Sequence, residues 1–100
     1  MIDPFDFIDW LKIGQWRIEI TGESGYDWQF WEVIIKDPLH VKEVKHLDER
    51  RDILLKQVLR DAIAKLSKTR NGHSALYSYR KQIEKRNREL TIEETYQKDD

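Results

Sequence analysis

The residues that could bind a metal ion are dispersed along this chain. The histidines are His40, His46 and His73, and there is no cysteine. On a strand that rises ~3.3 Å per residue, His40 and His46 would lie ~20 Å apart, too far to share one ion. The sequence therefore predicts no metal centre and no cofactor.

The residues that could act as nucleophiles also lack the patterns that catalysis uses. The serines are Ser24, Ser67, Ser74 and Ser78, and none lies in a Gly-x-Ser-x-Gly motif. The four glycines form neither of the common phosphate-binding loops. We expect no catalytic residues, which disfavours a small hydrolase and favours a binding protein.

Aromatic side chains are concentrated in the first third of the chain, where 8 of the 11 occur by residue 31. A β-hairpin has one inner face, so Trp28 and Trp31 should not both point inward. An exposed aromatic side chain with an acidic rim is typical of a protein-binding hot spot. The predicted protein-binding residues are Asp6, Asp9, Asp27, Trp31, Glu32 and Ile53, with Ile53 on the polar side of its helix.

A basic segment gives the alternative prediction. Residues 62–88 contain 8 basic side chains and 1 acidic one, whereas residues 1–37 contain 3 basic and 8 acidic ones. Clustered cations bind phosphates, and a tyrosine can stack on a base. The predicted nucleic-acid-binding residues are Lys65, Lys68, Arg70, Tyr77, Lys81, Lys85 and Arg88. The bland interpretation is that the acidic and basic segments neutralise each other, and the isoelectric point near 6.3 is low for a nucleic-acid binder.

The elements that must position these residues begin with a short helix. Asp3 and Pro4 form an N-cap signal, and Gly14 can end the helix. Residues 15–21 alternate like a half-buried strand, residues 22–25 form a turn, and a second strand follows over about 26–36. The apolar phase flips between Phe30 and Trp31, which predicts a β-bulge there or a strand covered on both faces.

The second half of the chain is predicted to be mainly helical. Residues 39–46 are ambiguous between a loop and a third strand, and the weakness of a two-stranded hairpin favours the strand. A long helix is expected from Asp48 to about residue 70, where Asn71 and Gly72 would end it. A last helix, capped by Ser74, should run into the 90s on the narrow apolar stripe Leu76, Tyr79, Ile83 and Leu90.

Together these elements predict an α+β fold with a short N-terminal helix, an antiparallel hairpin or three-stranded sheet, and two α-helices. Residues 1–96 are expected to form a single compact domain and residues 97–100 a frayed tail. We find no signal peptide and no stretch of the ~20 apolar residues that a membrane span needs. We therefore expect a cytoplasmic protein without membrane contact.

The function predicted from the sequence is that of a small non-catalytic protein-binding module with an acidic, aromatic-rich N-terminal surface. An inhibitor or adaptor of the kind that phages and mobile elements carry would fit this description. The alternative is a nucleic-acid-binding regulator that uses the basic face of the last helix. The sequence also leaves a homodimer open, since a short sheet and a narrow helix stripe both invite a partner.

Overall fold

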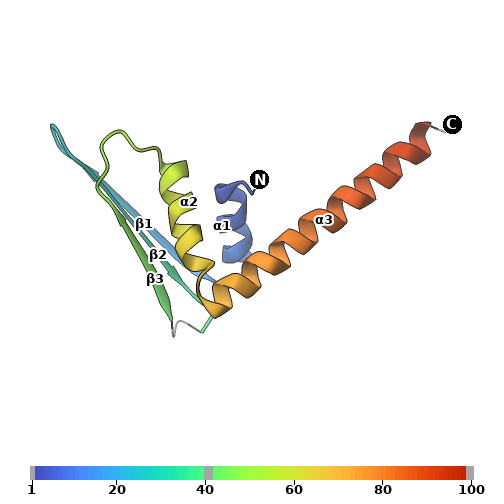
Figure 1. Ribbon diagram of the computed structural model, residues 1–100, viewed down its shortest axis with the longest axis horizontal. Helices are drawn as coiled ribbons and strands as arrows, with labels where there is room; N and C mark the ends of the chain where they lie inside the picture. Colours follow the sequence, from blue (N-terminus) through green and yellow to red (C-terminus); the bar gives the residue numbers. More distant parts are fainter. Residues whose placement is uncertain (1, 40–41, 99–100) are drawn as a thin grey trace.

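The computed structural model describes residues 2–39 and 42–98, with residues 90–98 described by their backbone alone. The elements follow in the order α1 (Pro4–Ile13), β1 (Arg17–Ser24), β2 (Gln29–Lys36), β3 (Glu43–Asp48), α2 (Leu55–Leu66) and α3 (Arg70–Lys98) (Figure 1). The predicted α+β class is confirmed, and the sheet has three strands.

The first helix begins and ends where the sequence indicates. The Asp3 carboxylate accepts hydrogen bonds from the backbone N–H groups of Phe5 at 2.8 Å and Asp6 at 3.3 Å. These bonds satisfy two N–H groups that have no partner within the helix. Gly14 follows the last turn as the C-cap. The buried side of α1 then packs on the rest of the protein through Phe7, Ile8 and Leu11.

The sheet is antiparallel, in the order β1-β2-β3. The pairing of β1 with β2 runs without interruption from Arg17 opposite Lys36 to Ser24 opposite Gln29, so the predicted β-bulge is wrong. The turn lies three residues later than expected, at residues 25–28. Tyr26 and Trp28 therefore precede β2 and do not contribute to its alternation, which removes the apparent change of phase.

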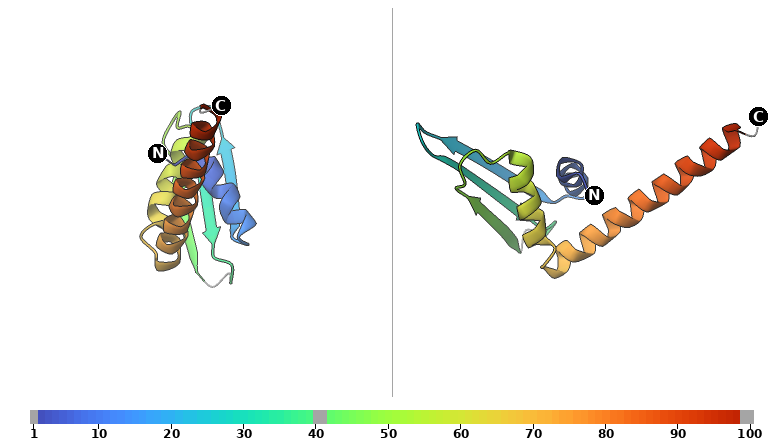
Figure 2. Two further views of the ribbon diagram at one scale, coloured as in Figure 1. Left: turned by 90° about the vertical axis from the view of Figure 1, so that its right-hand side faces the viewer. Right: turned by 45° about the horizontal axis from the view of Figure 1, so that its top comes forward.

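Helices α1 and α2 cover one face of the sheet, and no described element covers the other (Figures 1 and 2). The strand register places Trp31, Val33 and Ile35 of β2 on the covered face, because side chains alternate between faces. Val33 and Ile35 are buried and belong to the same core cluster as the buried side chains of α1 and α2. The buried apolar side chains that α2 contributes are Val58, Leu59, Ala62 and Leu66.

The helix predicted to start at Asp48 begins seven residues later, at Leu55. Asp48 is the last residue of β3 and lies opposite Trp31 in the sheet. Its carboxylate accepts from the backbone and side chain of Arg50 and so does not cap a helix at this point. The true start is marked by Gln57, whose side-chain oxygen accepts from the backbone N–H of Leu54 at 3.3 Å.

The boundary between the last two helices is also displaced from the prediction. Helix α2 ends at Leu66 and α3 begins at Arg70, so neither Asn71-Gly72 as a stop nor Ser74 as a cap is correct. Thr69 acts as the cap, since its hydroxyl accepts from the backbone N–H of Gly72 at 3.1 Å. Gly72 is buried in the first turn of α3, against the end of α2.

Helix α3 docks on the body through its first half and then projects away from it (Figure 1). The Tyr79 ring packs against Phe7 and Trp10, with ring centroids 5.1 and 5.4 Å apart. The Trp10 Nε1–H donates to Gln82 Oε1 at 2.9 Å. The helix continues to Lys98, so residues 97 and 98 are helical where fraying was expected. Asp99, Asp100 and the Leu90 side chain lie outside what the structure describes.

Candidate functional site

The turn between β1 and β2 exposes aromatic side chains at the far end of the sheet. The backbone N–H of Gly25 donates to the carbonyl of Trp28 at 2.9 Å, which closes the turn around Tyr26 and Asp27. Tyr26 is fully exposed and Trp28 has 52% of its surface exposed. Phe30, the next residue in the same phase as Trp28, is half-buried on the uncovered face of the sheet. Aromatic surface is thus available here without unfolding any element.

The Trp28 side chain lies across the turn against Gly25. A Cβ atom added to Gly25 would stand 2.0 Å from Trp28 Nε1, a distance at which atoms overlap. Because Gly25 has no side chain, the Trp28 indole can pack directly against the backbone at position 25. An aromatic side chain held in place in this way loses little conformational entropy when a partner binds it.

Acidic side chains surround these aromatic ones. Trp28 lines two shallow hollows of about 200 and 330 Å³, the first shared with Asp27, Arg51 and Asp52 and the second with Glu23 and Glu49. Asp52 has a backbone φ of 59°, in the left-handed region that aspartate tolerates better than most residues. The hairpin-end surface is defined here as Glu23, Tyr26, Asp27, Trp28, Phe30, Glu49 and Asp52.

The protein-binding residues expected from the sequence do not form one surface. Asp6 and Asp9 are exposed on α1, whereas Asp27 lies at the turn. Glu32 is on the uncovered face of the sheet, with its carboxylate 3.5 Å from Lys45 Nζ. Of the set, only Asp27 belongs to the hairpin-end surface.

Two members of that set pack inside the protein. Trp31 faces the helices and packs against the core. Ile53 precedes α2, is 7% exposed and has a carbonyl that accepts from Gln29 Nε2 at 3.2 Å. The expectation that Ile53 lies on the polar side of a helix is therefore wrong. The helix was expected to begin at Asp48, so Ile53 was assigned to one side of a helix to which it does not belong.

Five of the predicted nucleic-acid-binding residues lie on one exposed face of α3, which the sequence indicated for Tyr77, Lys81, Lys85 and Arg88. Arg70, Tyr77, Lys81, Lys85 and Arg88 are all exposed, and at 100° per residue they fall within ~80° of arc. The stripe is ~27 Å long and points away from the buried face formed by Leu76 and Tyr79. We call these five residues the basic face of α3.

Other charges modify this face. Lys81 lies over the Tyr77 ring, with Nζ 5.5 Å from the ring centroid, and its Nζ is 3.8 Å from a Glu84 oxygen. The exposed Lys68 lies in the turn directly before α3, and the exposed Lys65 lies in the last turn of α2. The structure therefore places all seven predicted nucleic-acid-binding residues on the outside of α2, α3 and the turn between them.

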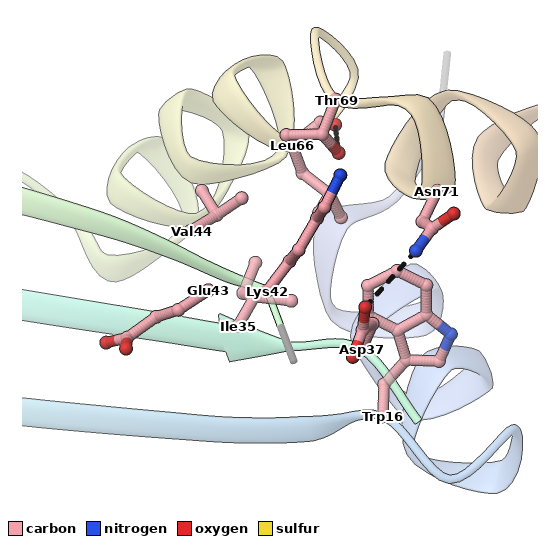
Figure 3. A pocket seen from close by; sticks show the side chains of 9 residues that line it. All are labelled: Trp16, Ile35, Asp37, Lys42, Glu43, Val44, Leu66, Thr69 and Asn71. Carbon is pink, nitrogen blue, oxygen red and sulfur yellow. Dashed lines mark hydrogen bonds between the residues drawn. The ribbon is translucent and has the colours of Figure 1, made fainter. Parts of the chain in front are cut away.

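A small cavity lies at the opposite end of the sheet from the turn, where β2, β3, α2 and α3 meet (Figure 3). It has a volume of about 230 Å³ and an apolar wall formed by Trp16, Ile35, Val44 and Leu66. Asn71 Nδ2 donates to the buried Asp37 carboxylate at 3.2 Å, and Lys42 extends toward the α2–α3 turn. This bond joins the end of β2 to the start of α3, which gives the polar wall a structural role.

A partly buried polar cluster joins the end of β3 to α2. His46 and Asp48 are two residues apart on β3 and therefore face the same side of the sheet, toward Asp61 of α2. Arg50 bridges the carboxylates of Asp48 and Asp61, with its Nη2 atom 2.7 Å from Asp48 Oδ2. The Arg50 guanidinium lowers the pKa of Asp48 to about 2, although burial acts in the opposite direction.

The prediction of no metal centre rested on the distance between histidines and did not consider a histidine paired with a carboxylate on one strand. The pattern His46-x-Asp48 places both side chains on one face only if the segment is a strand. His73 is exposed in α3, and His40 lies outside the described residues. The cluster therefore depends on one histidine and on tertiary packing against Asp61, which no local pattern reveals.

No helix in the described part of the chain is both long enough and apolar enough to cross a membrane. Comparisons of the chain with protein-family models, curated proteins and solved structures found no match.

Proposed function

We propose that this chain is a non-catalytic protein-binding module of the inhibitor or adaptor type, and that it binds its partner through the hairpin-end surface. The observation that carries the proposal is the exposure of Trp28, which is seated on Gly25 and surrounded by carboxylates. Tryptophan is enriched in protein-binding hot spots, and it removes a large apolar area from water on association. The helices bury the other three tryptophans of the chain at least in part.

The charge of the surface indicates the kind of partner. Glu23, Asp27, Glu49 and Asp52 contribute four negative charges and Arg51 one positive charge around the two aromatic side chains. Such a surface complements a partner patch with an apolar centre and basic rim, and it repels nucleic acid. The polar rim would act mainly on the association rate, while Trp28 would supply most of the affinity.

The proposal is tested by capturing partners from a lysate of the native host with the purified chain and with two variants. Trp28→Ala removes the proposed anchor, and Gly25→Ala keeps the indole but displaces it from its position against residue 25. Both should lose the captured protein in nuclease-treated and untreated lysate alike. Tyr77→Ala is the matched control, because Tyr77 is 60% exposed but lies on α3. Equal capture by Trp28→Ala and the parent chain would contradict the proposal.

The second candidate function is nucleic-acid binding through the basic face of α3. It is supported by the alignment of Arg70, Lys81, Lys85 and Arg88 on one outward side of a rigid helix. Each phosphate that a cation neutralises releases counterions, so affinity must fall steeply with salt concentration. Four such contacts give a slope of about −3 to −4 in a plot of log K against log salt.

Fluorescence anisotropy with labelled DNA and RNA at several salt concentrations measures this second candidate directly. Changing Lys81, Lys85 and Arg88 to Glu should abolish the salt-dependent binding. Changing the exposed Lys12, Lys42 and Lys56 to Glu alters the net charge equally and serves as the control. If the parent chain binds tightly at physiological salt and only the α3 variant loses binding, nucleic-acid binding replaces protein binding as the preferred function.

A further inference from the structure

The imidazole of His46 is buried without a hydrogen-bond partner. The residue is 9% exposed, and neither Nδ1 nor Nε2 has such a partner within the described part of the chain. The Asp48 Oδ2 atom lies 3.5 Å from His46 Nε2. That separation exceeds the 2.7–3.2 Å range of an N–H···O bond. Because buried polar atoms almost always have a partner, a further group is expected beside the imidazole.

The separation that is too long for a hydrogen bond suits two ligands of one metal ion. In a tetrahedral zinc site the metal–nitrogen and metal–oxygen distances are ~2.1 Å, which places neighbouring ligand atoms ~3.4 Å apart. Asp61 offers a third ligand atom from α2, and the three ligand atoms all lie within 4.8 Å of one another. A small rotation of the half-exposed Asp61 side chain would close this triangle further.

We propose that His46, Asp48 and Asp61 bind a divalent transition-metal ion of the zinc type. One imidazole nitrogen and two carboxylates form a donor set that zinc accepts, whereas Mg²⁺ prefers oxygen ligands alone. The ion would join β3 to α2. Asp61 has 46% of its side chain exposed, so water can reach the fourth coordination position from this side.

Arg50 is the competitor for this site. Its guanidinium bridges the two carboxylates, which is the position where a metal ion would place its positive charge. The Arg50 side chain is 62% exposed and can move into solvent when the ion binds. Arg50 should therefore weaken metal binding, and its removal should strengthen it. If the cluster were only a structural ion-pair network, removing Arg50 would not create or strengthen metal binding.

The test is isothermal titration of the full chain, freed of metal by a chelator, with Zn²⁺ and separately with Mg²⁺. The parent chain should show one saturable Zn²⁺ site and bind Mg²⁺ at least a hundredfold more weakly. Asp61→Asn should weaken Zn²⁺ binding at least tenfold, and Arg50→Gln should strengthen it severalfold. His73→Gln removes an exposed histidine of α3 and should leave the affinity unchanged.

Circular dichroism of each variant confirms that the fold is retained, and Asp61 is chosen over the buried His46 and Asp48 for this reason. Titration with Co²⁺ adds a spectroscopic readout, since a tetrahedral site of nitrogen and oxygen ligands gives visible absorption bands. The proposal is overturned if neither the parent chain nor Arg50→Gln shows saturable Zn²⁺ binding. It is equally overturned if Asp61→Asn binds as the parent does, or if His73→Gln abolishes binding.

Discussion

Two aspartates of this protein, Asp3 and Asp48, differ in what their carboxylates bind. Asp3 caps α1 as its sequence context predicts, because an N-cap acts within three residues. Asp48 has the same helix-start signal and yet ends a strand, where its carboxylate pairs with Arg50, which also pairs with Asp61. A capping residue is therefore decisive only where no other partner reaches it.

The Asp48 carboxyl should make folding stability depend on pH. Its pKa in the folded state is about 2, below its ordinary value of 3.8, so the unfolded state takes up a proton first as pH falls. The stabilisation is fully present above pH ~4 and is lost between pH ~4 and ~2, with a total of about 2 kcal/mol. Urea unfolding in chelator-containing buffer should show this loss for the parent chain.

Asp48→Asn provides the comparison for this pH dependence. Its unfolding free energy should be lower than that of the parent at pH 7 by about 2 kcal/mol, and the difference should vanish near pH 2. A difference that persists unchanged down to pH 2 would mean that the carboxylate charge is not what stabilises the cluster.

At the level of elements, strand and helix existence could be predicted but several boundaries could not. Periodicity located the hairpin and the apolar side of α2, because those patterns follow directly from backbone geometry. The β-bulge was predicted because aromatic residues of the turn were assigned to the second strand. The helix was predicted to start too early because an acidic residue before a loop looked like an N-cap. The two aromatic residues Tyr26 and Trp28 look like strand residues by composition, yet they lie in the turn.

The α2–α3 turn depends on the absence of a side chain at Gly72. A Cβ atom there would lie 2.0 Å from the backbone carbonyl oxygen of Leu66, which cannot move without shifting α2. Gly72→Ala should therefore destabilise the protein by about 1–3 kcal/mol, although alanine in a helix normally gains about 1 kcal/mol over glycine. Chemical denaturation measures the difference.

Gly14→Ala is the matched control for the Gly72 change. Gly14 has an ordinary φ of −80°, and an added Cβ atom would meet its nearest neighbour at 3.4 Å. We expect this variant to unfold within ~0.5 kcal/mol of the parent. If Gly72→Ala proves as stable as Gly14→Ala, the close packing of the two helices is wrong.

The whole molecule is more extended than its length requires, because α3 continues beyond the surface on which it docks. The radius of gyration of the Cα atoms is 17.1 Å, and the longest dimension is 60 Å. A compact domain of this length would have a radius of ~13 Å. Small-angle X-ray scattering of the monomer should give a value near 17 Å. A value near 13 Å would show that α3 folds back on the body in solution.

The two candidate surfaces of the molecule could be predicted from the sequence to different extents. Helical phase alone predicted that Tyr77, Lys81, Lys85 and Arg88 share one face, since all four belong to one regular element, whereas Arg70 joins this face only because α3 begins earlier than expected. An acidic and aromatic surface near the hairpin was predicted, but of the predicted residues only Asp27 belongs to the hairpin-end surface. Which residues form that surface depends on which strands pair and where the turn lies. Glu49 and Asp52 join it only because β3 brings the following loop beside the hairpin.

The central claim, that the partner binds at the hairpin end, is tested most directly by hydrogen exchange on the complex with the captured partner. We predict that partner binding slows exchange in residues 23–30 and 49–53 and leaves residues 70–89 of α3 unchanged. Protection confined to α3, with residues 23–30 exchanging as in the free protein, would contradict the claim.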